Sequence, residues 1–317
     1  MRSIQKGLLA SFLLFGLVAV PVVGGASMSG ATTAKATAGF PLRIKAANGT
    51  FTFKSRPSAI VSLSPTTTEM IYAIGAGSQV KAVDSYSNYP TKAPITKLSG
   101  YTPNVEAIAK YKPDLVVVSS DTAGFNKQMA ALKIPVIYEP AAATLNQAYK
   151  EYSNLGLATG HVAQAKSEVN KIKNTISHIV SSTPRAPKGT TYYYELDPTY
   201  YSVTTQTFVG QLFALLGLKS IADSATGIAA SGGYPQLSAE FILKANPTYI
   251  FLADTICCKA SAASVSKRSG WSALSAVKNG RVIGLSDDIA SRWGPRITIL
   301  LQDIANALEG KKVSATS

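Results

Sequence analysis

The chain has 317 residues, a length that suits two domains of ordinary size better than one small core. Hydrophobic residues make up 46% of the sequence and charged residues 15%, which favours packed cores and excludes an intrinsically disordered chain. Lysine and arginine outnumber aspartate and glutamate by 31 to 17, and only two histidines and two cysteines occur. These counts exclude a histidine-rich metal site, a zinc ribbon and a disulfide-stapled scaffold, so we expect no metal held by the protein itself.

Residues 1–26 have the pattern of a signal peptide. Arg2 and Lys6 precede an apolar run, residues 8–20, that is short for a membrane span, and small residues follow it. A retained membrane anchor is the alternative. Because no cysteine follows the apolar run, we expect an exported protein of the periplasm or extracytoplasmic cell envelope, and not a lipoprotein.

Strands and helices alternate from residue 56 to residue 143, after a segment, residues 27–55, that we expect to be flexible and to lead into the first lobe. The strands are continuous apolar runs, which is typical of a parallel sheet covered on both faces. We predict strands at residues 59–63, 80–83, 114–119 and 134–138, and helices at 70–74, 103–110 and 125–132.

A long helical region, residues 144–183, follows, with a break at Thr159-Gly160. The alternation then resumes over residues 184–317, where we predict a second α/β lobe. Its predicted strands are residues 192–196, 249–253 and 281–285, and its main helices are residues 208–216 and 297–308. The fold class is therefore α/β, with two lobes of mostly parallel sheet separated by helix.

A weak internal repeat supports two matching lobes. Residues 106–121 and residues 240–254 each read as a glutamate, a short helix, a proline, an apolar strand and an aspartate. Any joint of helix, proline and strand has some of this pattern, but the matching glutamate and aspartate at both ends favour duplication.

The residues of common catalytic and nucleic-acid-binding sites are missing. No nucleophile elbow and no phosphate-binding loop occurs, and the lysines are scattered rather than interleaved with aromatic residues. His161 and His178 are 17 residues apart in the helical region, so we expect each to be an exposed helix residue. We expect no enzyme activity and no nucleic-acid partner. For the adjacent Cys257 and Cys258, a vicinal disulfide or an intermolecular link is the expected role.

Aromatic and polar residues lie in the loops that follow the predicted strands. Ligands of open α/β sheets bind outside the carboxyl ends of the strands, and Tyr and Trp offer broad, rigid surfaces with a polar tip. These side chains suit a large amphipathic ligand. The candidate ligand-binding residues are Tyr86, Tyr101, Tyr200, Tyr201, Tyr234, Asp288, Arg292 and Trp293.

The order of these pieces resembles the periplasmic substrate-binding proteins of ABC importers for cobalamin, ferric siderophores and haem. The resemblance extends from about residue 56 to residue 308. It implies two α/β lobes joined by a single long helix, and partners that are permease subunits with a separate ATPase. It rests on the segments Ser62–Glu69, Asp84–Pro90, Pro103–Glu106, Lys112–Leu115 and Arg292–Arg296.

The same resemblance implies roles for individual residues. Glu106 and Glu240 match the two glutamates, one on each lobe, that bind arginines of the permease. Tyr86 matches a tyrosine that lines the corrin pocket of the cobalamin-binding branch, Tyr234 matches a tryptophan, and Tyr200 or Tyr201 matches a phenylalanine. Asp288 and Arg292 match polar contacts. Two further tryptophans of that branch fall on Gly100 and Ser119, which departs from its pattern, although Tyr101 is adjacent to the first.

The sequence therefore predicts a monomeric binding protein with no resident cofactor that captures cobalamin or a related corrinoid between its lobes. A ferric siderophore and haem are the alternative ligands within the family. An envelope hydrolase and a wall-adhesion module are the alternatives from other classes. Because a single helix resists bending, we expect little lobe closure.

Overall fold

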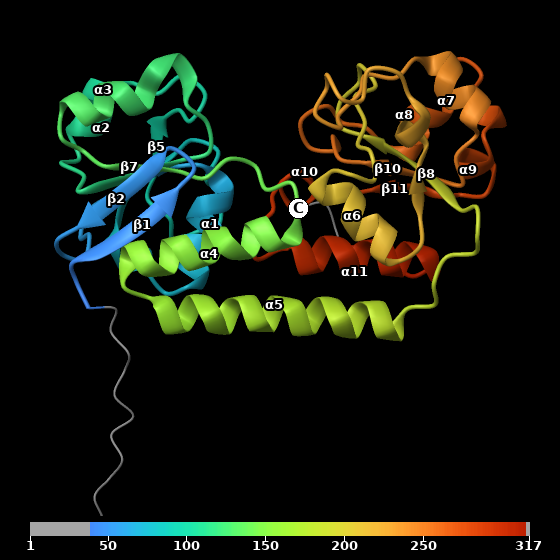
Figure 1. Ribbon diagram of the computed structural model, residues 1–317. Helices are drawn as coiled ribbons and strands as arrows, with labels where there is room; N and C mark the ends of the chain where they lie inside the picture. Colours follow the sequence, from blue (N-terminus) through green and yellow to red (C-terminus); the bar gives the residue numbers. More distant parts are fainter. Residues whose placement is uncertain (1–38, 315–317) are drawn as a thin grey trace, which may run out of the picture. The chain divides into compact units, whose positions relative to one another are not determined.

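The computed structural model describes residues 39–314 (Figure 1). The predicted signal peptide, residues 1–26, and the first part of the predicted flexible segment lie outside these residues. Within the described part of the chain, no helix is both long enough and apolar enough to cross a membrane.

The N-terminal lobe is built on a five-stranded sheet whose neighbouring strands are all parallel, in the order β5-β4-β3-β6-β7. The strands are β3 (Ile60–Leu63), β4 (Val80–Asp84), β5 (Ile95–Leu98), β6 (Leu115–Val118) and β7 (Val136–Tyr138). Its helices are α1 (Pro65–Ala73), α2 (Val105–Ala109) and α3 (Phe125–Ala131), with short 3-10 turns at Gly77–Gln79 and Thr122–Gly124. The predicted strands are confirmed, and β5 was missed because only its last residue is buried.

An antiparallel hairpin of β1 (Leu42–Ala46) and β2 (Gly49–Phe53) precedes this sheet. Ile44, Ala46 and Phe53 are buried in the apolar core, and the Ala47 amide donates to the carbonyl of Tyr138 at the end of β7. The prediction of a flexible segment over residues 27–55 is therefore wrong for residues 42–53. The alternation of exposed and buried residues along β1 is the pattern of a half-buried strand, and it was overlooked.

Two helices follow the first sheet, α4 (Leu145–Thr159) and α5 (Val162–Ser182). Gly160 ends α4 in the left-handed conformation, with φ of +72°, which confirms the predicted break. His161 caps α5 and is buried, so the prediction of an exposed histidine is wrong. Its Nε2 lies 3.1 Å from Nη2 of Arg56, which can only donate, so Nε2 accepts this bond and Nδ1 donates to the Thr159 carbonyl.

The C-terminal lobe is built on a four-stranded parallel sheet in the order β11-β10-β8-β9. The strands are β8 (Thr191–Glu195), β9 (Lys219–Ser220), β10 (Tyr249–Leu252) and β11 (Val282–Gly284). The helices are α6 (Phe208–Leu215), α7 (Ala239–Ala245), α8 (Ala262–Ser266), α9 (Ser275–Lys278), α10 (Asp287–Ala290) and α11 (Ile297–Leu308), with 3-10 turns at Ile221–Ser224 and Trp271–Ala273.

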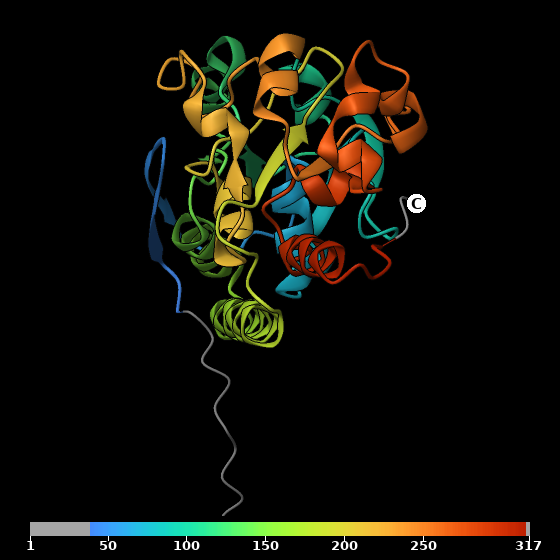
Figure 2. The same cartoon turned by 90° about the vertical axis from the view of Figure 1, so that its right-hand side faces the viewer.

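The two lobes share one apolar core. Successive residues of each buried strand point to opposite faces of its sheet: Leu115 and Val117 of β6 belong to the shared core, whereas Val116 and Val118 belong to a core private to the N-terminal lobe. The shared core also includes buried residues of α4, α5 and α11, such as Ile172 of α5 and Ile304 of α11. Helix α5 runs along one side of both lobes (Figures 1 and 2). The predicted fold class, two α/β lobes joined by one long helix, is confirmed.

Candidate ligand-binding and docking sites

Two exposed tyrosines lie side by side in the loops that follow β4 and β5. The rings of Tyr86 and Tyr101 meet edge to face, with centroids 5.8 Å apart. Tyr86 is 60% exposed and Tyr101 is 73% exposed. The structure therefore brings these two candidate ligand residues together at the carboxyl ends of the strands of the first sheet, where they offer exposed aromatic surface.

The three candidate tyrosines of the C-terminal lobe differ in their surroundings. Tyr200 stacks on the buried ring of Trp271, with centroids 5.8 Å apart, and packs against the core private to this lobe. Tyr201 pairs with Gln236 through an isolated antiparallel bridge, and both Tyr201 and Tyr234 remain exposed. Tyr201 and Tyr234 are therefore the candidates whose rings are most available to a ligand.

Arg292 connects the two lobes at the loops that carry candidate ligand-binding residues. Its guanidinium donates to Glu69 Oε1 at 2.9 Å, Asn88 Oδ1 at 2.9 Å, the Tyr86 carbonyl at 3.1 Å and Asp288 Oδ1 at 2.5 Å. Asn88 Nδ2 in turn donates to Asp288 Oδ2 at 2.6 Å. Arg292 is only 8% exposed, so four acceptors and burial leave this guanidinium little capacity for a ligand.

Trp293 is engaged with helix α4 and the shared core. Its Nε1 donates to Glu151 Oε2 of α4 at 2.8 Å, and its ring packs against the shared core. Burial, reinforced by the neighbouring carboxylate of Glu139, raises the pKa of Glu151 to about 8. The structure thus gives Trp293 a contact with the helical region between the lobes that the sequence did not suggest.

Three carboxyl groups follow the ends of three neighbouring strands in the C-terminal lobe. Glu195 ends β8, Asp254 follows β10 and Asp287 follows β11. Arg268 makes a two-pronged ion pair with the fully buried Glu195, at 2.5 and 2.6 Å, and its guanidinium lies 4.7 Å from the centre of the Trp271 ring. Sequence reasoning missed Glu195 and Arg268, although a glutamate that ends an apolar strand is a usable signal.

Asp254 is the middle carboxyl group of this row. Both of its carboxylate oxygens are buried without a hydrogen-bond partner. Burial and the nearby charge of Glu195 raise its pKa to about 7. Asp254 therefore keeps its proton under mildly acidic conditions, where an ordinary aspartate is ionised.

Cys257 and Cys258 are both free and exposed, so the vicinal disulfide, one of the two roles considered for them, is not present. The Cys257 amide donates to Asp287 Oδ2 at 2.8 Å, at the first residue of α10. Although the residue is exposed, partial desolvation of its sulfur, together with the neighbouring Cys258 and Asp287, raises the pKa of the Cys257 thiol to about 12, so this sulfur stays protonated. The loop that carries the two cysteines thus contacts helix α10, which also carries Asp288. It lies closer to the candidate site than the position of the cysteines in the sequence suggested.

Glu106 and Glu240 occupy equivalent positions in the two lobes. Each lies exposed in the first turn of a short helix, α2 or α7, whose preceding Asn104 or Ser238 side chain accepts a backbone N–H of that helix. Hydrogen bonds from its own backbone and from Ser238 lower the pKa of Glu240. Figures 1 and 2 show α2 and α7 on the side of the lobes opposite to α5.

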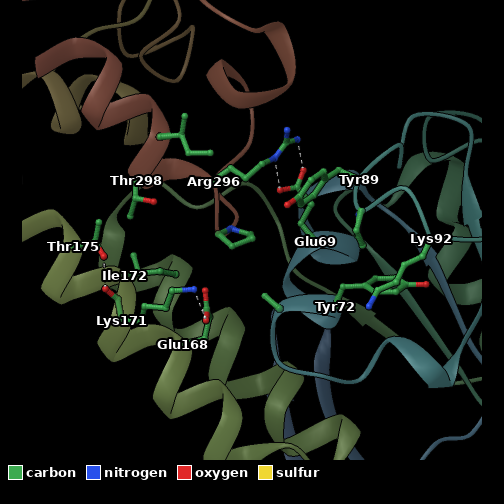
Figure 3. A pocket seen from close by; sticks show the side chains of 14 residues that line it. Glu69, Tyr72, Tyr89, Lys92, Glu168, Lys171, Ile172, Thr175, Arg296 and Thr298 are labelled. Atoms are coloured by element: carbon green, nitrogen blue, oxygen red, sulfur yellow. Dashed lines mark hydrogen bonds and ion pairs between the residues drawn. The ribbon is translucent and has the colours of Figure 1, made fainter. Parts of the chain in front are cut away.

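A hollow of about 390 Å³ lies beside Glu69, between α1, α5 and the start of α11 (Figure 3). Tyr72, Tyr89, Lys92, Lys171 and Arg296 are among its lining residues, and the Arg296 guanidinium lies 4.4 Å from the centre of the Tyr89 ring. None of the eight candidate ligand residues lines this hollow. Over residues 39–314, no group of three or more His, Cys, Asp or Glu side chains is placed to hold a metal ion.

Comparison with known proteins decides the family. A family model described as periplasmic binding protein matches residues 60–289. The chain belongs to this periplasmic binding protein family. The sequence prediction of a substrate-binding protein of ABC importers is confirmed.

Two relatives and one solved structure illustrate the similarity. An uncharacterized ABC transporter substrate-binding lipoprotein of Bacillus subtilis is 30% identical over 96% of this chain and 97% of its own length. A cobalamin-binding protein of Halobacterium salinarum is 26% identical over 84% of this chain and 74% of its own. The crystal structure of a possible iron-binding, periplasmic solute-binding protein from Staphylococcus epidermidis has a TM-score of 0.69 and 25% identity, over 80% of this chain and 99% of its own.

Family membership has consequences for function. The periplasmic binding protein family consists of transport proteins that bind substrates, not of enzymes. This chain is a substrate-binding component of an ABC transporter, and a permease and an ATPase are its implied partners.

The prediction of an exported protein that is not a lipoprotein is wrong. The Bacillus subtilis relative, which matches 96% of this chain, is named a lipoprotein. The prediction used the missing cysteine after residues 8–20. That observation concerns a single residue type, in a segment that lies outside the described residues.

Proposed function

We propose that this periplasmic binding protein captures cobalamin or a related corrinoid between its two lobes and delivers it to a permease. The observation that carries the proposal is the meeting of two ligand-binding loops at Arg292. The loop with Tyr86 belongs to the N-terminal lobe, and Arg292 of the C-terminal lobe donates to the Tyr86 carbonyl. Exposed aromatic rings of one lobe are thereby held next to polar residues of the other.

The chemistry of a corrinoid fits these residues. Its broad macrocycle offers apolar faces to the rings of Tyr86 and Tyr101 in one lobe and of Tyr201 and Tyr234 in the other. Its peripheral amides are donors and acceptors of the kind that Asn88 and Asp288 can satisfy. The relative from Halobacterium salinarum, named a cobalamin-binding protein, supports this choice of ligand.

A ferric siderophore or haem is the second candidate ligand. Exposed phenol groups such as those of Tyr86 and Tyr101 can bind ferric iron as phenolate, and the similar structure from Staphylococcus epidermidis is described as a possible iron-binding protein. An envelope hydrolase and a wall-adhesion module gain no support from the family.

We further propose roles for the three regions of the chain and for the two exposed glutamates. Residues 56–143 and 184–317 serve as the two lobes, and residues 144–183 hold them at a fixed separation. Glu106 and Glu240 dock a monomer of this protein on two arginine-bearing permease surfaces, one for each lobe. Their equal exposure and equivalent helix positions support this role.

Titration of the purified protein distinguishes the ligands. Cyanocobalamin, a ferric hydroxamate and haemin are each added while absorbance and heat are recorded. The proposal expects one-to-one binding of cyanocobalamin that is tighter than binding of the other two. Tighter binding of the hydroxamate or haemin would replace the corrinoid with that ligand, and no binding of any of the three would reject the proposed function.

A further inference from the structure

Glu69 is a buried carboxylate in α1 of the N-terminal lobe that holds two arginines of the C-terminal lobe. It is 1% exposed. Its Oε1 accepts from Arg292 Nη1 at 2.9 Å and from Arg296 Nη2 at 2.7 Å, and its Oε2 accepts from Arg296 Nε at 2.9 Å. Figure 3 shows the paired bonds with Arg296. One side chain therefore fastens α1 to the segment between α10 and α11.

The cluster around Glu69 pairs carboxylates with guanidinium groups. Asp288 pairs with Arg292 at 2.5 Å, so two carboxylates face two guanidinium groups. The Arg296 guanidinium also lies over the Tyr89 ring. Because Glu69 and Arg292 are shielded from water, the loss of one carboxylate leaves a guanidinium charge without its partner, and the surrounding residues cannot replace it.

The bond to Glu69 also fixes the direction of Arg292. With one Nη1 hydrogen held by Glu69, the other three Nη hydrogens of Arg292 reach Asn88 Oδ1, the Tyr86 carbonyl and Asp288. The loop that carries Tyr86 is thus held in place from the other lobe. The two-pronged pair of Glu69 with Arg296 keeps the Glu69 carboxylate in a defined orientation toward Arg292, which a lysine in place of Arg296 would not reproduce.

We infer that Glu69 is a positioning residue for ligand capture: it latches the two lobes together and, through Arg292, sets the place of the Tyr86 loop, without touching the ligand. The part of this inference that concerns the ligand rests on the proposed function. The part that concerns the lobes does not.

The test measures the separation of the lobes without any ligand. In a Cys257→Ser/Cys258→Ser background, spin labels are attached to cysteines that replace the exposed Lys110 after α2 and Lys244 in α7. Double electron–electron resonance spectroscopy then gives the distribution of distances between the two spin labels. Glu69→Gln and Glu69→Ala are compared with Glu168→Gln, a matched control because Glu168 lines the same hollow but pairs with Lys171 within α5.

The inference expects a narrow distribution in the parent protein and in the Glu168 variant, and a broad or shifted one in both Glu69 variants. A purely structural role would lower the melting temperature but leave the distribution narrow in the folded protein, and that result would overturn the inference. If Glu69→Ala fails to fold, Arg296→Gln tests the latch from the other lobe, with Arg281→Gln as its control. Unchanged distances in Arg296→Gln and Glu69→Gln would likewise overturn it.

Titration with cyanocobalamin separates this inference from the proposed function. If unlatched lobes occupy the binding-ready arrangement about one tenth of the time, the apparent affinity of Glu69→Gln falls about tenfold. If the Glu69 variants have a broad distance distribution and the parent protein does not bind cyanocobalamin, the latch is supported and the corrinoid is rejected as the ligand. A broad distribution with unchanged cyanocobalamin affinity would overturn the positioning role.

Discussion

The Tyr86 ring stands at 87° to the Tyr101 ring, with the two centroids 5.8 Å apart, while both rings remain more than half exposed. The edge-to-face contact holds two aromatic side chains rigid without burying either. Exposed, fixed aromatic surface binds a flat ligand at a low cost in side-chain entropy, which is why this pair is central to our account.

Substitution of Tyr86 by alanine should weaken ligand binding. The change removes one aromatic contact and the partner of the Tyr101 ring, a loss of about 1 kcal/mol or about fivefold in affinity. Calorimetric titration with cyanocobalamin measures it. Tyr111→Ala, which removes an exposed tyrosine that is not among the candidates, is the control, and equal affinities for both variants would contradict the placement of the pocket.

Substitution of Glu106 and Glu240 should impair transport without altering ligand affinity. Exposed charges at a docking surface contribute mainly when they are desolvated against arginine, so the double alanine variant should reduce stimulation of the transporter ATPase. The double lysine variant should reduce it further, because it adds repulsion. The assay uses vesicles with reconstituted permease, with the exposed Glu309→Ala as control; normal transport by the double lysine variant would eliminate the docking role.

Replacement of Arg268 by methionine should destabilise the C-terminal lobe. The change leaves Glu195 fully buried without its ion-pair partner, a cost of about 3–5 kcal/mol. Urea unfolding gives the difference, with Arg281→Met, an arginine over Tyr249, as the control. The double variant Arg268→Met/Glu195→Met should recover part of the loss, and a single variant as stable as the parent would contradict the assignment.

The free energy of unfolding should fall as the pH rises from mildly acidic to neutral. Asp254 and Glu151 have pKa values raised to about 7 and about 8, so the folded chain keeps protons that the unfolded chain releases at lower pH. Each group contributes at most about 1.4 kcal/mol per pH unit to this decline. The contribution of each carboxyl group to the free energy of unfolding is fully present below its pKa in the unfolded chain. It is lost as the pH rises through its pKa in the folded chain.

Urea titrations at several pH values check this dependence. Asp254→Asn and Glu151→Gln keep the size of each side chain but remove the titratable carboxyl group. Each variant should therefore show a flatter dependence of the free energy of unfolding on pH than the parent. Glu309→Gln, at an exposed position, should leave the profile unchanged. Parallel profiles for all four proteins would show that neither carboxyl group has a raised pKa.

Local patterns in the sequence predicted most of the fold. The apolar runs at Ile60–Leu63 and Leu115–Val118 become central strands buried on both faces, and Gly160 breaks the helical region where it was expected to. Short or half-exposed elements were missed, such as β5 and the β1–β2 hairpin. Strand β5 has only one buried residue and so gives no clear periodic signal, whereas the alternation along β1 was present in the sequence and was overlooked.

The candidate site was less predictable than the fold. Tyr86 could be placed after a predicted strand, but its contact with Tyr101 could not be predicted, because the strand before Tyr101, β5, was missed. The partners of Arg292 could not, since Glu69 lies 223 residues away and the contact depends on how the lobes pack. The same holds for Trp293, whose indole reaches Glu151 in α4, 142 residues away. Long-range polar pairs of this kind leave no local signature.

Hydrogen exchange with and without cyanocobalamin tests most directly whether a corrinoid binds between the lobes. With cyanocobalamin bound, the backbone amides of residues 85–89 and 99–102 of the N-terminal lobe should exchange more slowly. In the same experiment, exchange should also slow in residues 198–203 and 232–236 of the C-terminal lobe. The backbone around Glu106 and Glu240 should be unaffected. Protection confined to one lobe, or located at the hollow beside Glu69 instead of these loops, would contradict capture between the lobes.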